Sequence, residues 1–214
     1  MLEIEGLDDN SLADTFAKVS GWPQFKLFRR QALLALRGEN PSGSLLDVGC
    51  GGGWFLKDIH RALPKIALTG CDLSERMVQN AERNLKGKAK IYIGDAQNLP
   101  FESGTFDVVT STLAFHHFPE PHKALSEFYR ILKPSGLMMV SDFRRDCAGW
   151  FYKLIKFIGR YILPKKFREV NEPLGSIMAA FTLDEYNELM KQTSFHPWQI
   201  ISNSYQATLV GRKS

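Results

Sequence analysis

The sequence LLDVGCGGGW, residues 45–54, constrains the fold more than any other stretch of the chain. It reads as a buried strand that leads through a glycine-rich turn into a helix. Glycine backbone adopts positive φ easily, and the missing side chains leave room for a bound nucleoside beside the helix N-terminus. The stretch therefore predicts an α/β fold with a nucleoside-binding loop.

The spacing of these glycines differs from that of dinucleotide-binding proteins. Their fingerprint needs glycine at the first, third and sixth positions, and counting from Gly49 the sixth position is Trp54. The spacing here is Asp-x-Gly-x-Gly-x-Gly, with Asp47 two residues before Gly49. A carboxylate at this point favours a ligand with a positive charge and would repel a phosphate. The alternative is that Asp47 only braces the loop.

The rest of the chain alternates short apolar runs with helical patterns, which is typical of a mostly parallel sheet. Strands are expected at 44–48, 66–71, 90–93, 106–111 and 137–141, and helices at 54–63, 74–85, 119–132, 148–163 and from Thr182. Residues 199–202 and 205–210 predict a closing hairpin. The sheet should therefore end in an antiparallel edge.

Cysteine content and charge limit the compartment and the partners. The three cysteines show no Cys-x-x-Cys spacing, so neither a disulfide framework nor a cysteine zinc site is expected. Five acidic residues precede Lys18, the opposite of a signal peptide, and we expect a cytoplasmic protein. Residues 144–168 hold eight basic residues and one acid, a local charge of +7 in a chain of net charge +4. Basic character is thus confined to one segment, and no nucleic-acid partner is expected.

Five ordered stations extend the glycine motif: LLDVGCGGG, GCDLS, GDAQNLPF, FDVVTSTLAFHHF and ILKPSGLMMVSDF. In these stations, over residues 44–142, the chain resembles the class I S-adenosylmethionine-dependent methyltransferases, and it is similar to their ubiquinone and menaquinone biosynthesis type. The resemblance implies a Rossmann-like methyltransferase fold: a seven-stranded, mostly parallel sheet with an antiparallel last strand and helices on both faces. It also implies S-adenosyl-L-methionine as the cofactor and S-adenosyl-L-homocysteine as the product.

The resemblance assigns the cofactor contacts to Asp47, Gly49, Cys50, Gly51, Asp72, Leu73, Asp95, Ala96, Thr110 and Ser111. The glycine loop would serve the methionine portion. Asp72 would accept hydrogen bonds from both ribose hydroxyls, which suits the two oxygens of a carboxylate. Asp95 and the Ala96 N–H would bind adenine, and Thr110 and Ser111 would lie beside the transferring methyl group. The alternatives are that Asp72 and Asp95 are helix caps or turn formers and that Cys50 only fills space.

Methyl transfer from a sulfonium is a direct displacement, so alignment and exclusion of water are the main tasks of the protein. If the acceptor is a hydroxyl or a weakly acidic carbon, a general base helps, and His116 and His117 are the catalytic candidates. In an extended segment the two would point in opposite directions, so one at most would face the site. The alternative is that both orient the loop before Pro119. We expect no metal site.

The helix expected over 148–163 suggests the acceptor. Trp150, Leu154, Phe157, Ile158 and Tyr161 recur at helical spacing, and Lys153, Lys156 and Arg160 form a basic stripe beside them. One interpretation is a helix packed on the sheet with a solvated charged edge. The other is a lid over an apolar small-molecule acceptor, or peripheral contact of 148–168 with a membrane surface. The oligomeric state is left open.

Taken together, these patterns predict one methyltransferase domain over 1–214. It would comprise a helical flap (1–40), a cofactor-binding core (41–143), a helical acceptor or lid insertion (144–194) and a closing hairpin (195–214). The main functional prediction is methyl transfer to a small, hydrophobic or lipid-like acceptor. The alternatives are an RNA or protein methyltransferase, and a non-catalytic cofactor-binding subunit of a partner.

Overall fold

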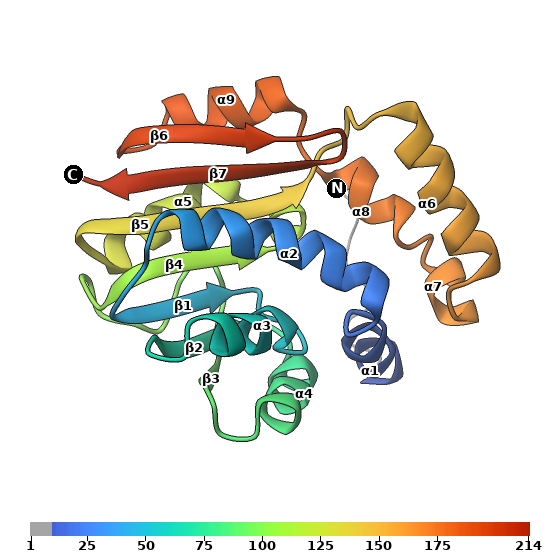
Figure 1. Cartoon of the computed structure of the whole chain (residues 1–214), viewed down its shortest axis with the longest axis horizontal. Coiled ribbons are helices and arrows are strands. Elements are labelled where there is room, and N and C mark those ends of the chain that lie inside the picture. The colour runs from blue at the N-terminus through green and yellow to red at the C-terminus, as the bar shows by residue number, and fades with distance from the viewer. Residues whose placement is uncertain (1–9) are drawn as a thin grey trace.

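The computed structural model describes residues 10–214 and is organised by a seven-stranded sheet (Figure 1). The strands are β1 (Ser44–Val48), β2 (Ala67–Asp72), β3 (Lys90–Ile93), β4 (Phe106–Thr112), β5 (Leu132–Phe143), β6 (Phe195–Ser202) and β7 (Gln206–Lys213). Their order is β3-β2-β1-β4-β5-β7-β6. Strand β7 runs antiparallel to both of its neighbours, and the remaining pairs are parallel. The expected α/β class with an antiparallel last strand is confirmed.

Helices cover both faces of this sheet. They are α1 (Asn10–Val19), α2 (Pro23–Gly38), α3 (Trp54–Ala62), α4 (Glu75–Leu85), the 3₁₀ helix η1 (Phe115–His117), α5 (Pro121–Ile131), α6 (Gly149–Tyr161), α7 (Lys165–Glu169), α8 (Leu174–Ala179) and α9 (Leu183–Lys191). Side chains of α2, α3 and α4 share one apolar core with Leu45, and those of α5 and α9 share another with Leu46. Neighbouring residues of β1 thus point to opposite faces, as a strand requires.

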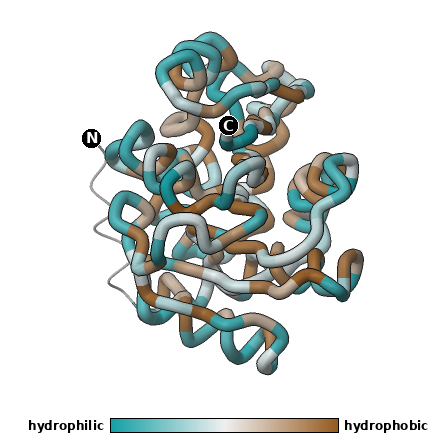
Figure 2. The backbone as a smooth tube through the Cα atoms, turned by 90° about the vertical axis from the view of Figure 1, so that its left-hand side faces the viewer, coloured by the Kyte–Doolittle hydropathy of each residue, from teal (hydrophilic) through white to brown (hydrophobic). Residues whose placement is uncertain are grey.

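Local chemistry sets several helix boundaries. The Ser74 hydroxyl accepts a hydrogen bond from the Met77 N–H at 3.3 Å, and Thr182 and Glu185 form the expected capping box. Both arrangements satisfy N–H groups that a helix leaves open at its start. Hydrophobic and hydrophilic stretches alternate along the backbone in Figure 2, as expected for helices with one buried face.

Strand β5 begins earlier than the sequence pattern suggests. We expected a helix to Leu132 and a strand from 137, but α5 ends at Ile131 and β5 starts at Leu132. Phe106 pairs with Leu132 and Val108 pairs with Leu137, so the register shifts between these two pairs. The segment between Leu132 and Leu137 is therefore a bulge within the strand, and Ser135 adopts a φ of 62° there.

Short helices lie beyond the carboxyl ends of β1, β4 and β5, where α6, α7 and α8 extend past the sheet with α1 nearby (Figure 1). Sequence patterns predicted α6 but not α1, α7 or α8 as separate elements. Helix α1 contacts α7 through the Phe16 and Phe167 rings, which stack with centroids 4.2 Å apart. The first nine residues of the expected flap lie outside the described residues.

Candidate functional site

The glycine loop lies between β1 and α3, at the carboxyl end of β1, an inner strand of the sheet. Gly49 adopts a φ of 69°, and a Cβ atom on it would lie 2.6 Å from the Ala114 Cβ. Gly51 adopts a φ of 51°, and a Cβ atom on it would meet no atom within 4 Å. Close packing therefore explains the first glycine, whereas the second faces open space that a ligand could fill.

Asp47 lies on β1 directly before this loop, and its carboxylate is buried, with 2% of the residue exposed. The Thr110 hydroxyl of the adjacent strand β4 donates a hydrogen bond of 2.8 Å to Asp47 Oδ1. Burial raises the pKa of Asp47 to about 7, the Thr110 hydrogen bond opposes the shift, and the nearby Asp72 carboxylate adds to it. The fold thus brings together Asp47 and Thr110, two of the predicted site residues.

Asp72 ends β2 and braces the glycine loop. Its Oδ2 accepts a hydrogen bond from the Gly51 N–H at 2.7 Å, and its Oδ1 accepts one from the Ser74 N–H at 3.0 Å. Burial raises the pKa of Asp72, although both hydrogen bonds oppose the shift. A carboxylate offers about four lone-pair positions, so two remain for a ligand. Asp72 can therefore hold the loop in place and still accept hydrogen bonds from a ligand.

Asp47 and Asp72 place two acidic groups beside one loop without a cation between them. Within residues 10–214 neither carboxylate takes part in an ion pair. Buried carboxylates of this kind are costly unless a positive group or further donors accompany them. The two carboxylates, together with the open space at Gly51, therefore fit a ligand that carries a positive charge.

The two candidate catalytic histidines lie in η1, directly after β4. The expectation of an extended segment was wrong, because residues 115–117 form a turn of 3₁₀ helix and the two rings lie with centroids 4.0 Å apart. His116 Nδ1 lies 2.9 Å from each oxygen of Asp142, and the His116 backbone N–H donates to Oδ2 of the same carboxylate at 2.9 Å. The ring orientation of His116 is thus fixed by a fully buried aspartate.

The two histidines differ in electrostatics. Burial lowers the pKa of His116, but the Asp142 carboxylate and Glu172 outweigh it, so the net shift is upward. Burial lowers the pKa of His117 to about 3, and repulsion from His116 contributes. His117 is therefore a neutral ring at physiological pH, whereas His116 is the better proton acceptor.

Four buried polar atoms lack a hydrogen-bond partner within the described part of the chain. They are Ser111 Oγ, Thr112 Oγ1, His116 Nε2 and Gln206 Oε1. Ser111 and Thr112 end β4, η1 follows directly, and Gln206 begins β7, which pairs with the end of β5. All four atoms thus lie at one end of the sheet. Because buried polar atoms are nearly always hydrogen-bonded, each of these atoms is open to a further hydrogen-bond partner. Ser111 and Thr112 are successive residues of β4 and point to opposite faces of the sheet, so the four atoms do not share one site.

Comparison with known proteins places this geometry in a family. A family model described as a methyltransferase domain matches residues 46–140. Over 197 residues the chain is 30% identical to the ubiquinone/menaquinone biosynthesis C-methyltransferase of Desulfotalea psychrophila, with 90% of this chain and 75% of that protein covered. The chain belongs to the S-adenosyl-L-methionine-dependent methyltransferases. S-Adenosyl-L-methionine is therefore its cofactor, and S-adenosyl-L-homocysteine is the product formed from it.

Further similarities agree with this assignment. The methyltransferase is 29% identical over 196 residues to the demethylmenaquinone methyltransferase of Lactococcus lactis, with 88% of this chain and 74% of that protein covered. The crystal structure of the plantazolicin methyltransferase BpumL, in complex with a desmethylplantazolicin analogue and S-adenosylhomocysteine, matches with a TM-score of 0.71 at 18% identity. That match covers 97% of this chain and 91% of the other, and it shows the shared fold.

The remaining predicted contacts of the methyltransferase are Cys50 in the glycine loop, Leu73 after β2, and Asp95 and Ala96 after β3. Asp95 follows β3 and accepts hydrogen bonds from the Gln97 N–H and side-chain amide at 2.9 to 3.3 Å, so it forms a turn in addition to any ligand role. Ala96 is buried beside it, and Cys50 is buried at 7% exposure. Leu73, by contrast, is 71% exposed directly after Asp72. An apolar side chain left so open beside the loop is consistent with a ligand-facing position.

Sequence reasoning did not single out two buried polar residues at this end of the sheet, Asp142 and Gln206. Asp142 lies within the motif ILKPSGLMMVSDF, and its position near the carboxyl end of β5 is the signal for a place on the ligand side of the sheet. Gln206 donates to Ser141 Oγ at 2.9 Å and leaves Oε1 unpartnered. No local signal marks Gln206, since its neighbours come from strands distant in sequence.

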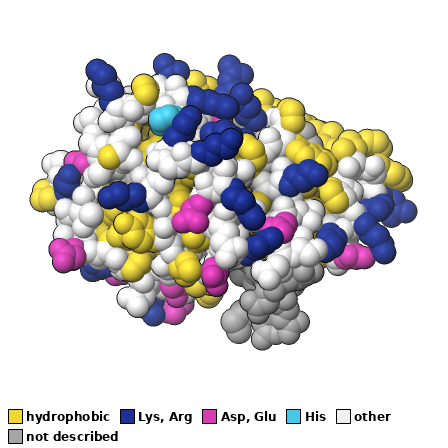
Figure 3. Space-filling view, turned by 90° about the horizontal axis from the view of Figure 1, so that it is seen from below, with side chains coloured by type: hydrophobic (Ala, Val, Ile, Leu, Met, Phe, Trp, Pro, Cys, Tyr) yellow, Lys and Arg dark blue, Asp and Glu magenta, His cyan; other side chains and the backbone are white. Residues whose placement is uncertain are grey.

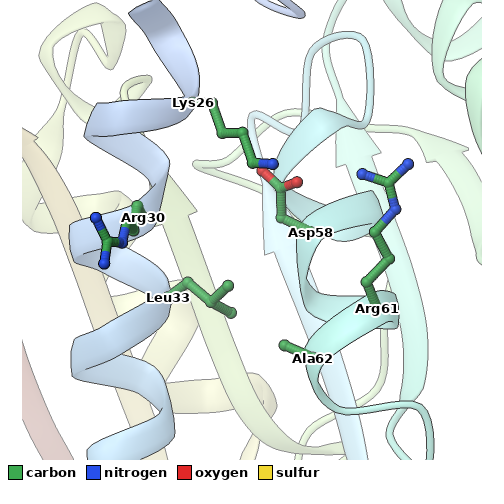
Figure 4. Close-up of a pocket in the computed structure, with 6 residues that line it drawn as sticks. All are labelled: Lys26, Arg30, Leu33, Asp58, Arg61 and Ala62. Carbon is green, nitrogen blue, oxygen red and sulfur yellow. The ribbon is translucent and has the colours of Figure 1, made fainter. Parts of the chain in front are cut away.

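A separate surface cavity of about 270 Å³ lies between α2 and α3 (Figure 4). It is lined by Lys26, Arg30, Leu33, Asp58, Arg61 and Ala62. The Asp58 carboxylate already accepts a hydrogen bond of 2.8 Å from Arg29 in an ion pair. None of the predicted site residues of the methyltransferase lines this cavity, and the chemistry is assigned to the carboxyl end of the sheet.

Proposed function

We propose that the methyltransferase methylates a small apolar acceptor of the quinol type, with His116 as the proton acceptor. The observation that carries the proposal is the His116 Nε2 atom, which is buried and unpartnered on a ring that Asp142 holds in place. An oriented histidine with one free nitrogen is the arrangement of a general base. Two relatives are named for ubiquinone/menaquinone biosynthesis and for demethylmenaquinone, and these names support the acceptor class.

Aromatic side chains beside His116 support an apolar acceptor. The Phe143 ring centroid lies 6.3 Å from that of His116 and 5.3 Å from that of Phe28. Phe28, Phe143 and Phe151 belong to one apolar cluster formed by α2, α6, α8 and the end of β5. Apolar walls with a few convergent polar groups are typical of sites for small hydrophobic molecules. We propose that residues 144–194 cover the acceptor and that the N-terminal segment covers the cofactor.

The residues present fit the cofactor. We propose that Asp47 and the loop at Gly49–Gly51 hold its methionine portion, that the free lone pairs of Asp72 accept the ribose hydroxyls, and that Asp95 and Ala96 contact adenine. When bound, S-adenosylmethionine supplies an electrophilic methyl group whose bond to sulfur breaks as the bond to the acceptor forms.

His116 and Asp142 serve the acceptor half of the reaction. The ring carbon of a phenol is a weak nucleophile until the hydroxyl proton leaves, and His116 Nε2 is the group we assign to take that proton. After methyl transfer the methylated ring carbon loses its own proton to solvent, and the imidazolium returns its proton to the ring oxygen, which restores the aromatic phenol. Asp142 accepts from Nδ1–H, which fixes the tautomer with Nε2 as the acceptor and stabilises the imidazolium that forms. The buried site excludes water, so the methyl group is not lost to hydrolysis.

Incubation with an isotopically labelled methyl donor and a set of apolar acceptors tests the proposal. We expect labelled methyl groups on short-chain demethylated quinols, detected by mass spectrometry, and none on RNA or protein substrates offered at the same concentration. The control is protein without acceptor, which should show cofactor binding and no transfer. Label on RNA or protein alone would contradict the proposed acceptor class.

We expect the affinity for S-adenosylmethionine to fall as the pH drops below about 7. Burial raises the pKa of Asp47 to about 7, from an ordinary value of 3.8. A cationic ligand favours the ionised carboxylate, so protonation of Asp47 weakens binding by up to about tenfold per pH unit below that pKa. Titration calorimetry across this range measures the slope. Asp47→Asn should bind S-adenosylmethionine more weakly at neutral pH, and its affinity should no longer depend on pH in this range. An affinity of the wild-type protein that does not change with pH would show that Asp47 does not interact with the positive charge of the cofactor.

The same pKa sets the sign of a stability effect in the ligand-free protein. Folded Asp47 keeps its proton up to pH about 7, whereas an unfolded aspartate releases it near 3.8. Its contribution to the free energy of unfolding is therefore fully present below the lower value and is lost as the pH rises through the higher one, by about 1.4 kcal/mol per pH unit. Asp47→Asn should remove this part of the decline, which thermal unfolding at several pH values measures.

A further inference from the structure

Helix α6 exposes an unusual concentration of large apolar side chains. Trp150, Leu154, Phe157 and Tyr161 are 57%, 44%, 55% and 67% exposed. They recur at i, i+4, i+7 and i+11, which places them on one stripe along the helix. A neighbouring face of the helix carries Phe151 and Ile155 into the apolar cluster next to the site. Trp150 also meets the Tyr205 ring edge-on, with centroids 6.4 Å apart, but more than two fifths of each side chain in the stripe still faces outward.

Basic side chains flank this stripe on one side. Lys153, Lys156 and Arg160 are exposed, and within residues 10–214 none of them has an acidic partner in an ion pair. The helix contains no acidic residue. We call these three cations and the four apolar side chains of the stripe the α6 surface. It lies at the end of the molecule where Figure 3 shows hydrophobic side chains gathered with Lys and Arg beside them.

We propose that the α6 surface docks the protein on a bilayer that contains anionic phospholipid. Charge complementarity selects the occupant, because the partner must be acidic at its face and apolar just beneath it. Trp and Tyr favour the boundary between headgroups and acyl chains, and an amphipathic helix with cations on one flank lies in that plane. Tyr161 and Ile162 extend the apolar contact to the end of the helix, and Ile162 is 53% exposed.

The depth of insertion follows from the helix itself. Helix α6 has 13 residues, about 20 Å of length, against about 30 Å of bilayer hydrocarbon. In the described part of the chain, no helix combines the length and the apolar character needed to cross a membrane. Orientation follows from the stripe: with Trp150 and Phe157 toward the acyl chains, Phe151 and Ile155 face the cluster that contains Phe143.

The inference rests on the proposed function in one respect only, namely that an apolar acceptor resides in the bilayer. The docked helix then lies between the acceptor's source and the aromatic wall next to His116. Vesicle binding itself requires no acceptor and no turnover. The two proposals can therefore fail separately.

Co-sedimentation with vesicles tests the docking. We expect the wild-type protein to bind vesicles of phosphatidylcholine with about a third phosphatidylglycerol, and to bind pure phosphatidylcholine at least about tenfold more weakly. Lys153→Glu/Lys156→Glu/Arg160→Glu should weaken binding to the anionic vesicles by more than about fiftyfold, and Trp150→Ala/Phe157→Ala by about tenfold. Increasing salt should weaken the wild-type interaction.

The matched control is Lys65→Glu/Lys88→Glu/Lys90→Glu, which changes the net charge equally at exposed positions around β2 and β3. It should retain most of the binding. Equal loss in both triple variants, or no binding by the wild type, would overturn the proposal. Light scattering tests whether the α6 surface instead holds two copies of the chain together. A dimer that is lost in Trp150→Ala/Phe157→Ala and does not bind vesicles would also overturn the docking proposal. Calorimetry with S-adenosylmethionine, whose affinity the α6 variants should keep, separates the loss of vesicle docking from a general loss of the folded protein.

Discussion

His116→Gln should lower kcat for methyl transfer by about 10²–10⁴-fold while leaving the affinity for S-adenosylmethionine nearly unchanged. His116 Nε2 is the buried, unpartnered nitrogen to which we assign proton removal, and Nδ1 is held by Asp142 at 2.9 Å. Glutamine can donate to Asp142, so the buried carboxylate is not left unpaired. Single-turnover methylation and calorimetric titration with the cofactor measure the two quantities separately.

The pH profile distinguishes a base from a merely structural histidine. A base works in its neutral form, so activity should fall as the pH drops below the pKa of His116, which Asp142 and Glu172 raise against the effect of burial. Asp142→Asn removes the negative charge that raises the pKa of His116, so the loss of activity at low pH should move to a lower pH. His122→Gln changes an exposed histidine of α5 and serves as the control. A normal rate in His116→Gln would show that the acceptor needs no base from this ring.

Gly51→Val should weaken S-adenosylmethionine binding by about a hundredfold or more, about 2.8 kcal/mol. A side chain at this position would enter the open space above the glycine loop, and the loop N–H groups would shift because valine is strained at a φ of 51°. The Gly51 N–H also donates to Asp72, so a shifted loop disturbs the proposed ribose contact as well. Calorimetry with the cofactor and with S-adenosylhomocysteine measures the loss.

Gly87→Val is the matched control for this change. Gly87 has a φ of 79°, and a Cβ atom on it would also meet no atom within 4 Å, but it follows α4 away from the loop. Both variants should lose similar stability from backbone strain, about 1–2 kcal/mol. Only the Gly51 variant should lose cofactor affinity. Equal affinities in the two would mean that the space above Gly51 is not where the cofactor binds.

The sheet could be predicted from the sequence because its signals are local. Apolar runs, the glycine turn and the caps at Ser74 and Thr182 each specify their own few residues. The strand order is not local in this sense, since the chain passes from the edge strand β3 to the middle strand β4. The start of β5 was misjudged because Pro134 and Gly136, usual turn residues, here sit in a bulge. Helices α7 and α8 were missed because they have only five and six residues, too few for a periodic pattern.

The site was predicted less completely than the fold. Asp47 and Thr110 meet because they lie near the carboxyl ends of neighbouring paired strands, which a sequence pattern can indicate. The pairing of His116 with Asp142 spans 26 residues and depends on how η1 turns back toward β5, which residues 115–117 alone do not specify. Likewise, the spacing of the apolar residues over 148–163 predicted a helix but not which of its faces points outward. The buried face is set by packing against Phe28 and Phe143, which are distant in sequence.

Helix α1 contacts both the glycine-loop side of the sheet, through α3 and α4, and the helices that follow β5, through α7. The Trp54 N–H donates to the Ala17 carbonyl beside the glycine turn at 2.6 Å, Arg76 of α4 binds both oxygens of Asp14, and Phe16 stacks on Phe167 of α7. An outward movement of α7 must therefore either break the contact between Phe16 and Phe167 or pull α1 away from the glycine turn, where we propose that S-adenosylhomocysteine is bound after the reaction. If the acceptor enters by that movement, we expect acceptor entry and departure of S-adenosylhomocysteine to be coupled, so that the two ligands exchange in a fixed kinetic order.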